Sequence, residues 1–103
     1  TITYPLIAMG ADGVISVIGN AFPQAFSTMV RLARRGDITS ALPIHHSFKE
    51  LYPLLFVDGN PSGIKMAMKH LGMLNGHLRL PLVPMTDENS AKMAAVLSDI
   101  TGK

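Results

Sequence analysis

An almost uninterrupted apolar run at residues 13–18 (GVISVI) most strongly constrains what this chain of 103 residues can fold into. Its β-branched residues predict a strand, and the lack of apolar–polar alternation indicates a strand covered on both faces, as in parallel sheets. One strand cannot satisfy its own backbone hydrogen-bonding groups, and the sequence offers no convincing second strand. We therefore expect neighbouring strands from another chain or, as we favour, a piece cut from a larger α/β protein. The first residue, Thr1 rather than Met, agrees with the second interpretation.

The rest of the sequence is typical of helices. Residues 1–9 predict the end of a helix that stops at Gly10, and Pro23 suits the first turn of a second helix over residues 22–35. Asp37 can cap a third helix, whose apolar face runs from Ile38 to Phe56. Pro43 lies near its first turns, and Pro53 should kink it.

Two further helices are predicted after a turn at residues 58–61. The first covers roughly 61–71, and the second covers about 87–100 with Thr86 or Asp87 as its cap. Between them, residues 73–85 predict an extended connection that lays four apolar side chains along the body: Leu78, Leu80, Leu82 and Val83.

Composition excludes several classes of function. The net charge of only +2 argues against nucleic acid as the main partner, because a nucleic-acid-binding domain concentrates basic residues on one face. The chain has no cysteine, so neither a disulfide framework nor a thiolate zinc site is possible. Its apolar runs are far shorter than the roughly 20 residues of a membrane span. These features predict a cytoplasmic protein with no membrane partner.

Individual chemical groups give weak indications of a site. His45 and His46 are adjacent, so on a helix they cannot share one metal ion, and we expect no metal site. Ser16 is interpreted as a satisfied core hydroxyl because it lacks the surroundings of a nucleophile elbow. None of the five lysines follows an apolar strand, which argues against a Schiff-base role for each: Lys49, Lys65, Lys69, Lys92 and Lys103. The loop at residues 19–23, between a strand end and a helix start, is the position at which barrels place their active sites.

Several motifs occur together in order. They are Gly10-Ala-Asp-Gly-Val-Ile-Ser-Val17 with Asn20, Leu55-Phe-Val-Asp-Gly-Asn-Pro61 with Lys65, Leu71-Gly72, and Leu78-Arg-Leu-Pro-Leu82 with Pro84. With these spacings the chain resembles the C-terminal part of the dihydrodipicolinate synthases (4-hydroxy-tetrahydrodipicolinate synthases), within the dihydrodipicolinate synthase/N-acetylneuraminate lyase superfamily. The Leu-Arg-Leu-Pro-Leu motif favours the synthases. Pro43 and Pro53 depart from the common pattern.

The resemblance implies an α/β parent with a (β/α)8 TIM barrel, of which this chain is a mostly α C-terminal fragment. Residues 1–36 would supply the end of the barrel: a helix tail, the eighth strand at 13–18 and the eighth helix at 22–35. Residues 37–103 would form a C-terminal extension of three helices. Such a barrel needs about 250 residues, so more than half would lie outside this chain.

The resemblance also implies an activity: a class I aldolase-type lyase of lysine and diaminopimelate biosynthesis. Pyruvate forms a Schiff base with a lysine, and the resulting enamine attacks aspartate semialdehyde. In the family that lysine, the proton-relaying tyrosine and threonines and the lysine feedback site lie upstream, so the fragment alone should be inactive. One position carries over: Ile15, which would line the pyruvate site chiefly through its backbone.

The remaining implications concern partners and alternatives. The resemblance implies no cofactor, a homotetramer, and pyruvate and aspartate semialdehyde as substrates of the parent. Ile15 could equally be a plain barrel-core residue. A sibling pyruvate-dependent aldolase, such as N-acetylneuraminate lyase, would differ in the aldehyde. A helical interaction module that buries residues 13–18 against a second copy is the non-enzymatic alternative, and in either case an exposed apolar strand should promote association.

Overall fold

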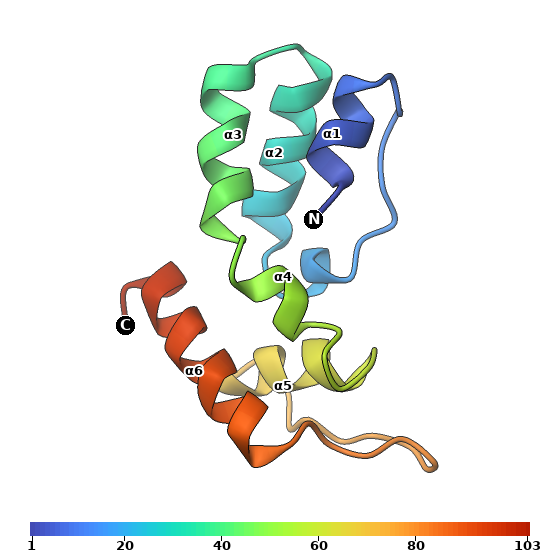
Figure 1. Ribbon diagram of the computed structural model, residues 1–103, viewed down its shortest axis with the longest axis vertical. Coiled ribbons are helices and arrows are strands. Elements are labelled where there is room, and N and C mark those ends of the chain that lie inside the picture. Colours follow the sequence, from blue (N-terminus) through green and yellow to red (C-terminus); the bar gives the residue numbers. More distant parts are fainter. The chain divides into compact units, whose positions relative to one another are not determined.

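The computed structural model describes all 103 residues as helices joined by irregular segments (Figure 1). The chain divides into two compact units, residues 1–49 and 50–103. The division reflects packing within each unit. The boundary after residue 36, which the resemblance implies between barrel and extension, stays a prediction. No helix combines the length and the apolar character needed to cross a membrane.

Three helices form the first unit, with α2 in contact with both others. Its central residues Phe26 and Met29 are buried, and Pro23 opens the helix at its first position, as predicted. The Asp37 side chain caps α3 by accepting a hydrogen bond from the Ser40 amide at 3.1 Å, as expected. The elements are α1 (Thr3–Ala8), the 3-10 turn η1 (Ile18–Asn20), α2 (Pro23–Arg34) and α3 (Ile38–Ser47).

The strand expected at residues 13–18 is not formed in this chain. Residues 11–16 adopt no regular secondary structure, and Ile18 already belongs to the turn η1. The physical reason is the one that made the run unusual: a strand exists only through hydrogen bonds to neighbouring strands, and this chain contains none. The prediction of a mostly helical chain is confirmed.

The long kinked helix expected over residues 37–56 is instead two helices. The first, α3, ends at Ser47, and α4 (Leu51–Leu54) begins after a short break. The prediction that Pro53 kinks a continuous helix was therefore wrong. Pro53 lies in the first turn of α4, where its missing N–H has no intrahelical partner to lose, while Pro43 is accommodated inside α3. The predicted apolar face also fails at its two ends, because Ile38 and Phe56 are exposed.

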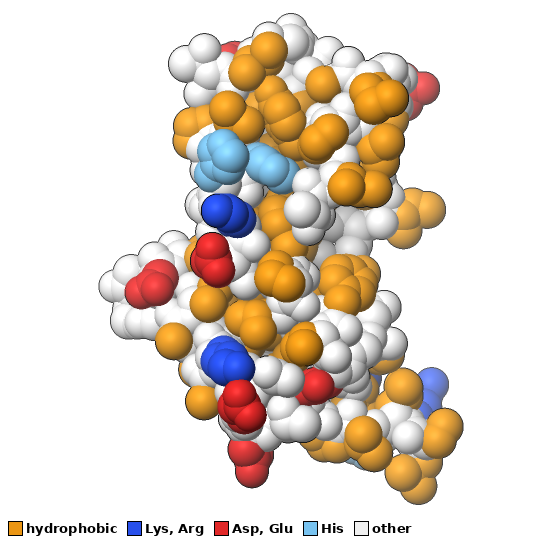
Figure 2. Space-filling model, in the orientation of Figure 1, with side chains coloured by type: hydrophobic (Ala, Val, Ile, Leu, Met, Phe, Trp, Pro, Cys, Tyr) orange, Lys and Arg blue, Asp and Glu red, His pale blue; other side chains and the backbone are white.

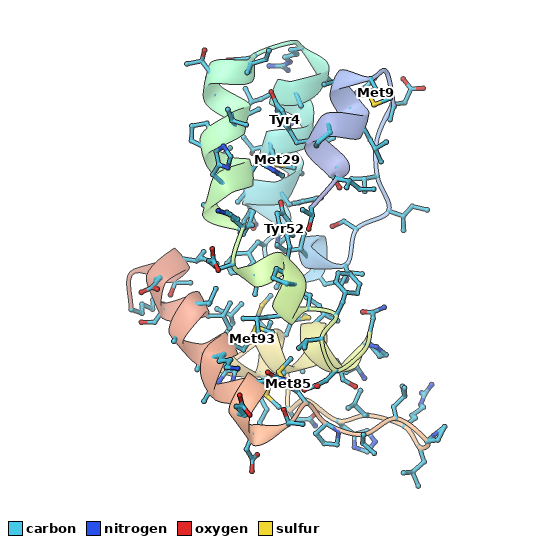
Figure 3. The ribbon with its side chains drawn as sticks, in the orientation of Figure 1. Tyr4, Met9, Met29, Tyr52, Met85 and Met93 are labelled. Carbon is cyan, nitrogen blue, oxygen red and sulfur yellow. The ribbon has the colours of Figure 1, made fainter.

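The second unit packs α4 and α5 (Ser62–His70) against α6 (Asp87–Thr101). Two buried methionines belong to its core: Met85, which precedes α6, and Met93 within it (Figure 3). Thr86 caps α6 as predicted, since its hydroxyl accepts a long hydrogen bond of 3.4 Å from the Asn89 amide. Asp87 and Glu88 follow in the first turn, where negative charge complements the helix dipole.

The connection between α5 and α6 is extended, as predicted, but of its four apolar side chains expected along the body only Leu78 is half-buried, and Leu80, Leu82 and Val83 are exposed. It runs outward and returns to the start of α6 (Figure 1). Leu80 and Val83 expose 89% and 65% of their surface. The expectation that they lie along the body was wrong, because the backbone turns at Arg79–Leu82 and carries them away from α5 and α6.

One glycine of α5 marks a very close approach of two backbones. A Cβ built on Gly63 would overlap the carbonyl group of Leu55, which ends α4. Gly63 has no positive φ, so the requirement concerns space and not conformation. The start of α5 can lie against the end of α4 only because residue 63 lacks a side chain.

Gly63→Ala should therefore destabilise the second unit. Elsewhere in a helix the change would stabilise by up to about 1 kcal/mol through helix propensity. Here backbone must move, and overpacking of this kind costs about 1–3 kcal/mol. Chemical denaturation of the variant checks the sign, with Gly13→Ala as the control, since a Cβ there meets nothing within 4 Å. A Gly63→Ala variant as stable as the parent would contradict the close contact.

Candidate functional site

The segment from Gly10 to Pro23, which carries the predicted pyruvate contact, is held at both ends. Gly10 has a φ of +108° and ends α1, and the Ala11 amide donates to the Leu6 carbonyl at 3.0 Å. At the other end, the Phe22 amide donates to the Ile18 carbonyl at 3.0 Å, just before α2 begins. Residues 11–16, between these anchors, adopt no regular secondary structure.

Ile15 lies in the middle of this segment and is fully exposed, at 105% of its reference surface. Val14 beside it is 43% exposed, and Met9 at the end of α1 is 83% exposed (Figure 3). Hydrophobic side chains accordingly gather on the visible surface of α1 and the segment that follows it (Figure 2). Exposed apolar surface of this kind marks a face that other protein surface covers.

Ser16 makes a specific local contact. Its Oγ accepts a hydrogen bond from the Gly19 amide at 2.9 Å, and the Asn20 side-chain amide donates to the Val17 carbonyl at 3.0 Å. These two bonds close the turn that joins the segment to α2. The hydroxyl thus has a structural partner, which agrees with its interpretation as a satisfied polar group and gives no support to a nucleophile.

A hollow of about 400 Å3 lies between this segment and α2. Arg31 is the one charged residue on its wall, and its guanidinium donates to the Thr28 hydroxyl at 3.1 Å. The nearby Arg34–Asp12 pair is long, at 4.0 Å, and exposed, so it contributes little. The wall also includes Gly13, Val14, Ser16, Gly19 and Phe26.

The four histidines do not converge. His45 stacks on Tyr4 with ring centroids 5.6 Å apart, and burial, followed by the neighbouring charges of His46 and the amino terminus, lowers the pKa of His45. His70 contacts the Ser90 hydroxyl at 3.0 Å on the other unit's helices. No group of three histidine or carboxylate side chains is placed to hold one metal ion.

The lysines all lie at or near the surface. Lys65 donates to the His77 carbonyl at 2.6 Å, and Lys92 pairs with Glu88 at 2.8 Å. Lys49, Lys69 and Lys103 are exposed. A Schiff-base lysine needs an apolar site that disfavours its charged form, and the structure places none of the five in such a site.

A second hollow, of about 620 Å3, was not indicated by the sequence. It lies in the second unit and is lined by Lys65 of α5 together with Asn75, His77 and Arg79 of the connection. Asn75, His77 and Arg79 alternate along the connection, but no sequence spacing relates them to Lys65 of α5, so only the path of the connection brings the four together.

Nearly the whole chain, including the segment from Gly10 to Pro23, matches one protein family. The model of the dihydrodipicolinate synthetase family matches residues 1–100. The chain belongs to this family. The resemblance stated from the motifs is thereby confirmed, and so is the assignment to the C-terminal part of a TIM-barrel protein.

Individual relatives of the dihydrodipicolinate synthetase family agree. The chain is 57% identical over 99 residues to a 4-hydroxy-tetrahydrodipicolinate synthase of Phocaeicola vulgatus, covering 96% of this chain and 33% of that protein. It matches an Acinetobacter baumannii dihydrodipicolinate synthase, solved as a chloride-inhibited complex with pyruvate, with TM-score 0.91 and 30% identity over 97% of this chain and 34% of that one. A structure described as a monomeric dihydrodipicolinate synthase variant gives TM-score 0.91 and 31% identity, over 97% and 33%. The chain thus spans about a third of the relatives it matches.

Ser16→Ala should cost about 1 kcal/mol of stability, because it removes the acceptor of the half-buried Gly19 amide. The matched control is Ser27→Ala, because Ser27 lines the same hollow. Its hydroxyl is exposed and donates only to the Gln24 carbonyl within α2. That control should change stability by no more than about 0.5 kcal/mol. Urea unfolding of both variants compares them, and equal losses would show that the Ser16–Gly19 bond has no stabilising role.

Proposed function

We propose that this chain is the C-terminal part of a lyase that condenses pyruvate with aspartate semialdehyde through a lysine Schiff base, in lysine and diaminopimelate biosynthesis. The observation that carries the proposal is the 57% identity, over nearly the whole chain, to a protein named 4-hydroxy-tetrahydrodipicolinate synthase. The pyruvate bound to the Acinetobacter baumannii relative supports the first substrate. The names of both relatives favour the synthase reaction over that of a sibling aldolase acting on another aldehyde.

The chain by itself is proposed to be inactive. Its lysines lie at or near the surface, so none is enclosed in the buried apolar surroundings that an activated amine requires. We propose that the Schiff-base lysine lies in the part of the relatives that this chain does not span, as the family resemblance implies. The chain would therefore contribute the last barrel elements and the helical extension, while the reacting amine belongs to the remaining two thirds.

Ile15 is the one residue proposed to contact substrate. Its side chain is exposed here and its segment makes no ladder bonds, so both backbone and side chain are open to neighbouring structure. In the whole protein the contact would be made chiefly by the backbone of residue 15. The tight turn at residues 16–20 supports this proposal, because it fixes the end of the segment next to α2.

The whole protein is further proposed to be a cytoplasmic homotetramer. The exposed apolar residues Leu6, Met9 and Val14 support the view that the first unit is covered by further protein surface. The monomeric family variant means that the assembly differs between family members. The mass of the whole protein in solution tests the tetramer directly.

Borohydride trapping tests the proposed chemistry. The 103-residue chain incubated with pyruvate and borohydride should gain no stoichiometric adduct, whereas the whole protein should gain one 1-carboxyethyl group per chain, because hydride reduces the Schiff base of pyruvate to a stable amine. Intact mass spectrometry measures both. A stoichiometric adduct on the 103-residue chain would overturn its inactivity, and an unmodified whole protein would overturn the Schiff-base mechanism.

The trapped whole protein also tests Ile15. In its crystal structure a backbone atom of Ile15 should lie within about 4 Å of the carboxyethyl group derived from pyruvate, the limit of direct contact. Ile18, three residues further on and buried, serves as the internal comparison and should lie outside that range. A carboxyethyl group remote from residue 15 would leave Ile15 as a barrel-core residue only.

A further inference from the structure

We infer that Asn75–Gly76 is a site of spontaneous covalent modification, at which the Asn75 side chain deamidates through a cyclic imide formed with the Gly76 backbone nitrogen. The pair lies in the connection between α5 and α6, which runs out from the second unit (Figure 1). Asn75 is exposed, so water reaches both the starting amide and the imide.

The chemistry needs no reagent other than water. The Gly76 nitrogen loses its proton to water and attacks Asn75 Cγ, the N–Cγ bond forms, and the Cγ–Nδ2 bond breaks as ammonia leaves with a proton. Water then opens the five-membered imide at either carbonyl. One product has aspartate at position 75, and the other has isoaspartate, in which the backbone continues through the former side-chain carbon.

The other three asparagines show why position 75 is singled out. Asn60 precedes Pro61, which has no N–H to act as a nucleophile. Asn20 and Asn89 precede residues whose amides are engaged: the Ala21 N–H donates to the Ile18 carbonyl at 3.0 Å, and the Ser90 N–H donates to the Thr86 carbonyl at 2.8 Å. The Gly76 N–H makes no hydrogen bond within the chain. Only the Asn75 pair combines a free amide with a following glycine.

The local geometry favours attack at Asn75. Its Oδ1 accepts a hydrogen bond from the His77 amide at 2.9 Å, which folds the side chain back over the backbone of residues 75–77. The bond goes to the carbonyl oxygen, so it draws electrons from Cγ and stabilises the oxyanion that forms on attack, as an oxyanion-hole donor does. Gly76 has a φ of +79° and no side chain to obstruct ring closure.

Positive charge surrounds the site. Lys65 and Arg79 line the same hollow of about 620 Å3 as Asn75. The Lys69 side chain lies against Gly76, since a Cβ there would come within 2.9 Å of the Lys69 Cδ. These cations favour loss of the Gly76 amide proton and the negative charge of the tetrahedral intermediate. The product carboxylate also gains by lying among them, and the net charge of +2 falls by one.

Peptide mapping of the aged chain tests the inference. After incubation at neutral pH and 37 °C, the peptide containing Asn75 should gain about one mass unit and appear as aspartate and isoaspartate forms. Conversion at Asn75 should be at least about tenfold faster than at Asn20 or Asn89, because only there are the reacting groups free and adjacent. Asn75→Gln should abolish the gain, since its ring closure is slower.

Two controls make the outcome decisive. A synthetic peptide of residues 70–81 gives the rate of deamidation in the absence of the fold. If Asn75 of the folded chain is still intact when half of this peptide has deamidated, the inference is overturned. Lys69→Gln should slow conversion about two- to fivefold, the range for one nearby screened charge. Lys92→Gln is the matched charge control within the same unit and should leave the rate unchanged, because Lys92 pairs with Glu88 on α6 and does not line the hollow. Equal slowing by both variants would contradict the local electrostatic argument.

Discussion

Backbone hydrogen bonding at residues 11–16 is the constraint on which the first unit depends. These residues have the composition of a strand buried on both faces, yet the chain provides no neighbouring strand. The backbone of residues 12–15 therefore makes no hydrogen bond within the chain, and Ile15 is left wholly exposed. Family membership explains the conflict, because the chain spans only about a third of its relatives, whereas a closed barrel satisfies each strand with the strands on either side.

The helices form without these neighbouring strands, because a helix needs only hydrogen bonds within its own segment. The first unit is organised by α2, whose buried Phe26 and Met29 lie on one stripe. The Ser16–Gly19 and Asn20–Val17 bonds close the turn before α2 without help from a sheet. The position of the candidate site is thus fixed by the turn and the helix, while the site itself stays open on the side that the rest of a barrel would cover.

Local signals in the sequence predicted the helix starts well, but features that depend on contacts between distant segments could not be predicted from it. Pro23, Asp37 and Thr86 mark helix starts because each acts through its own first turn. The break after Ser47 and the exposure of Leu80 depend on packing between segments, which periodicity does not contain. The same holds for the contact of Gly63 with the Leu55 backbone. At the candidate site, the sequence could indicate residue 15 only through motifs, because no chemical group there has a distinctive spacing.

The second unit shows how an exposed connection can be held firmly at its end and loosely in its middle. Asp58 accepts hydrogen bonds from the Asn89 side chain at 2.9 Å and from both the amide and the hydroxyl of Thr86, at 2.9 and 3.1 Å. These hydrogen bonds lower the pKa of Asp58, and the bond from the Asn89 side chain has the largest effect. They keep a negative charge near the start of α6.

Ser62, which is buried, adds a bond to the Val83 carbonyl at 2.8 Å, so the return of the connection to α6 is fixed from two sides. Further out, the hydrogen bonds are the one from Lys65 to the His77 carbonyl and those of local turns. Anchoring at residues 83–86 therefore defines the path of the backbone without engaging every amide along it. The free Gly76 amide is a consequence of that arrangement, since the bonds that hold the connection are concentrated where it meets the helices.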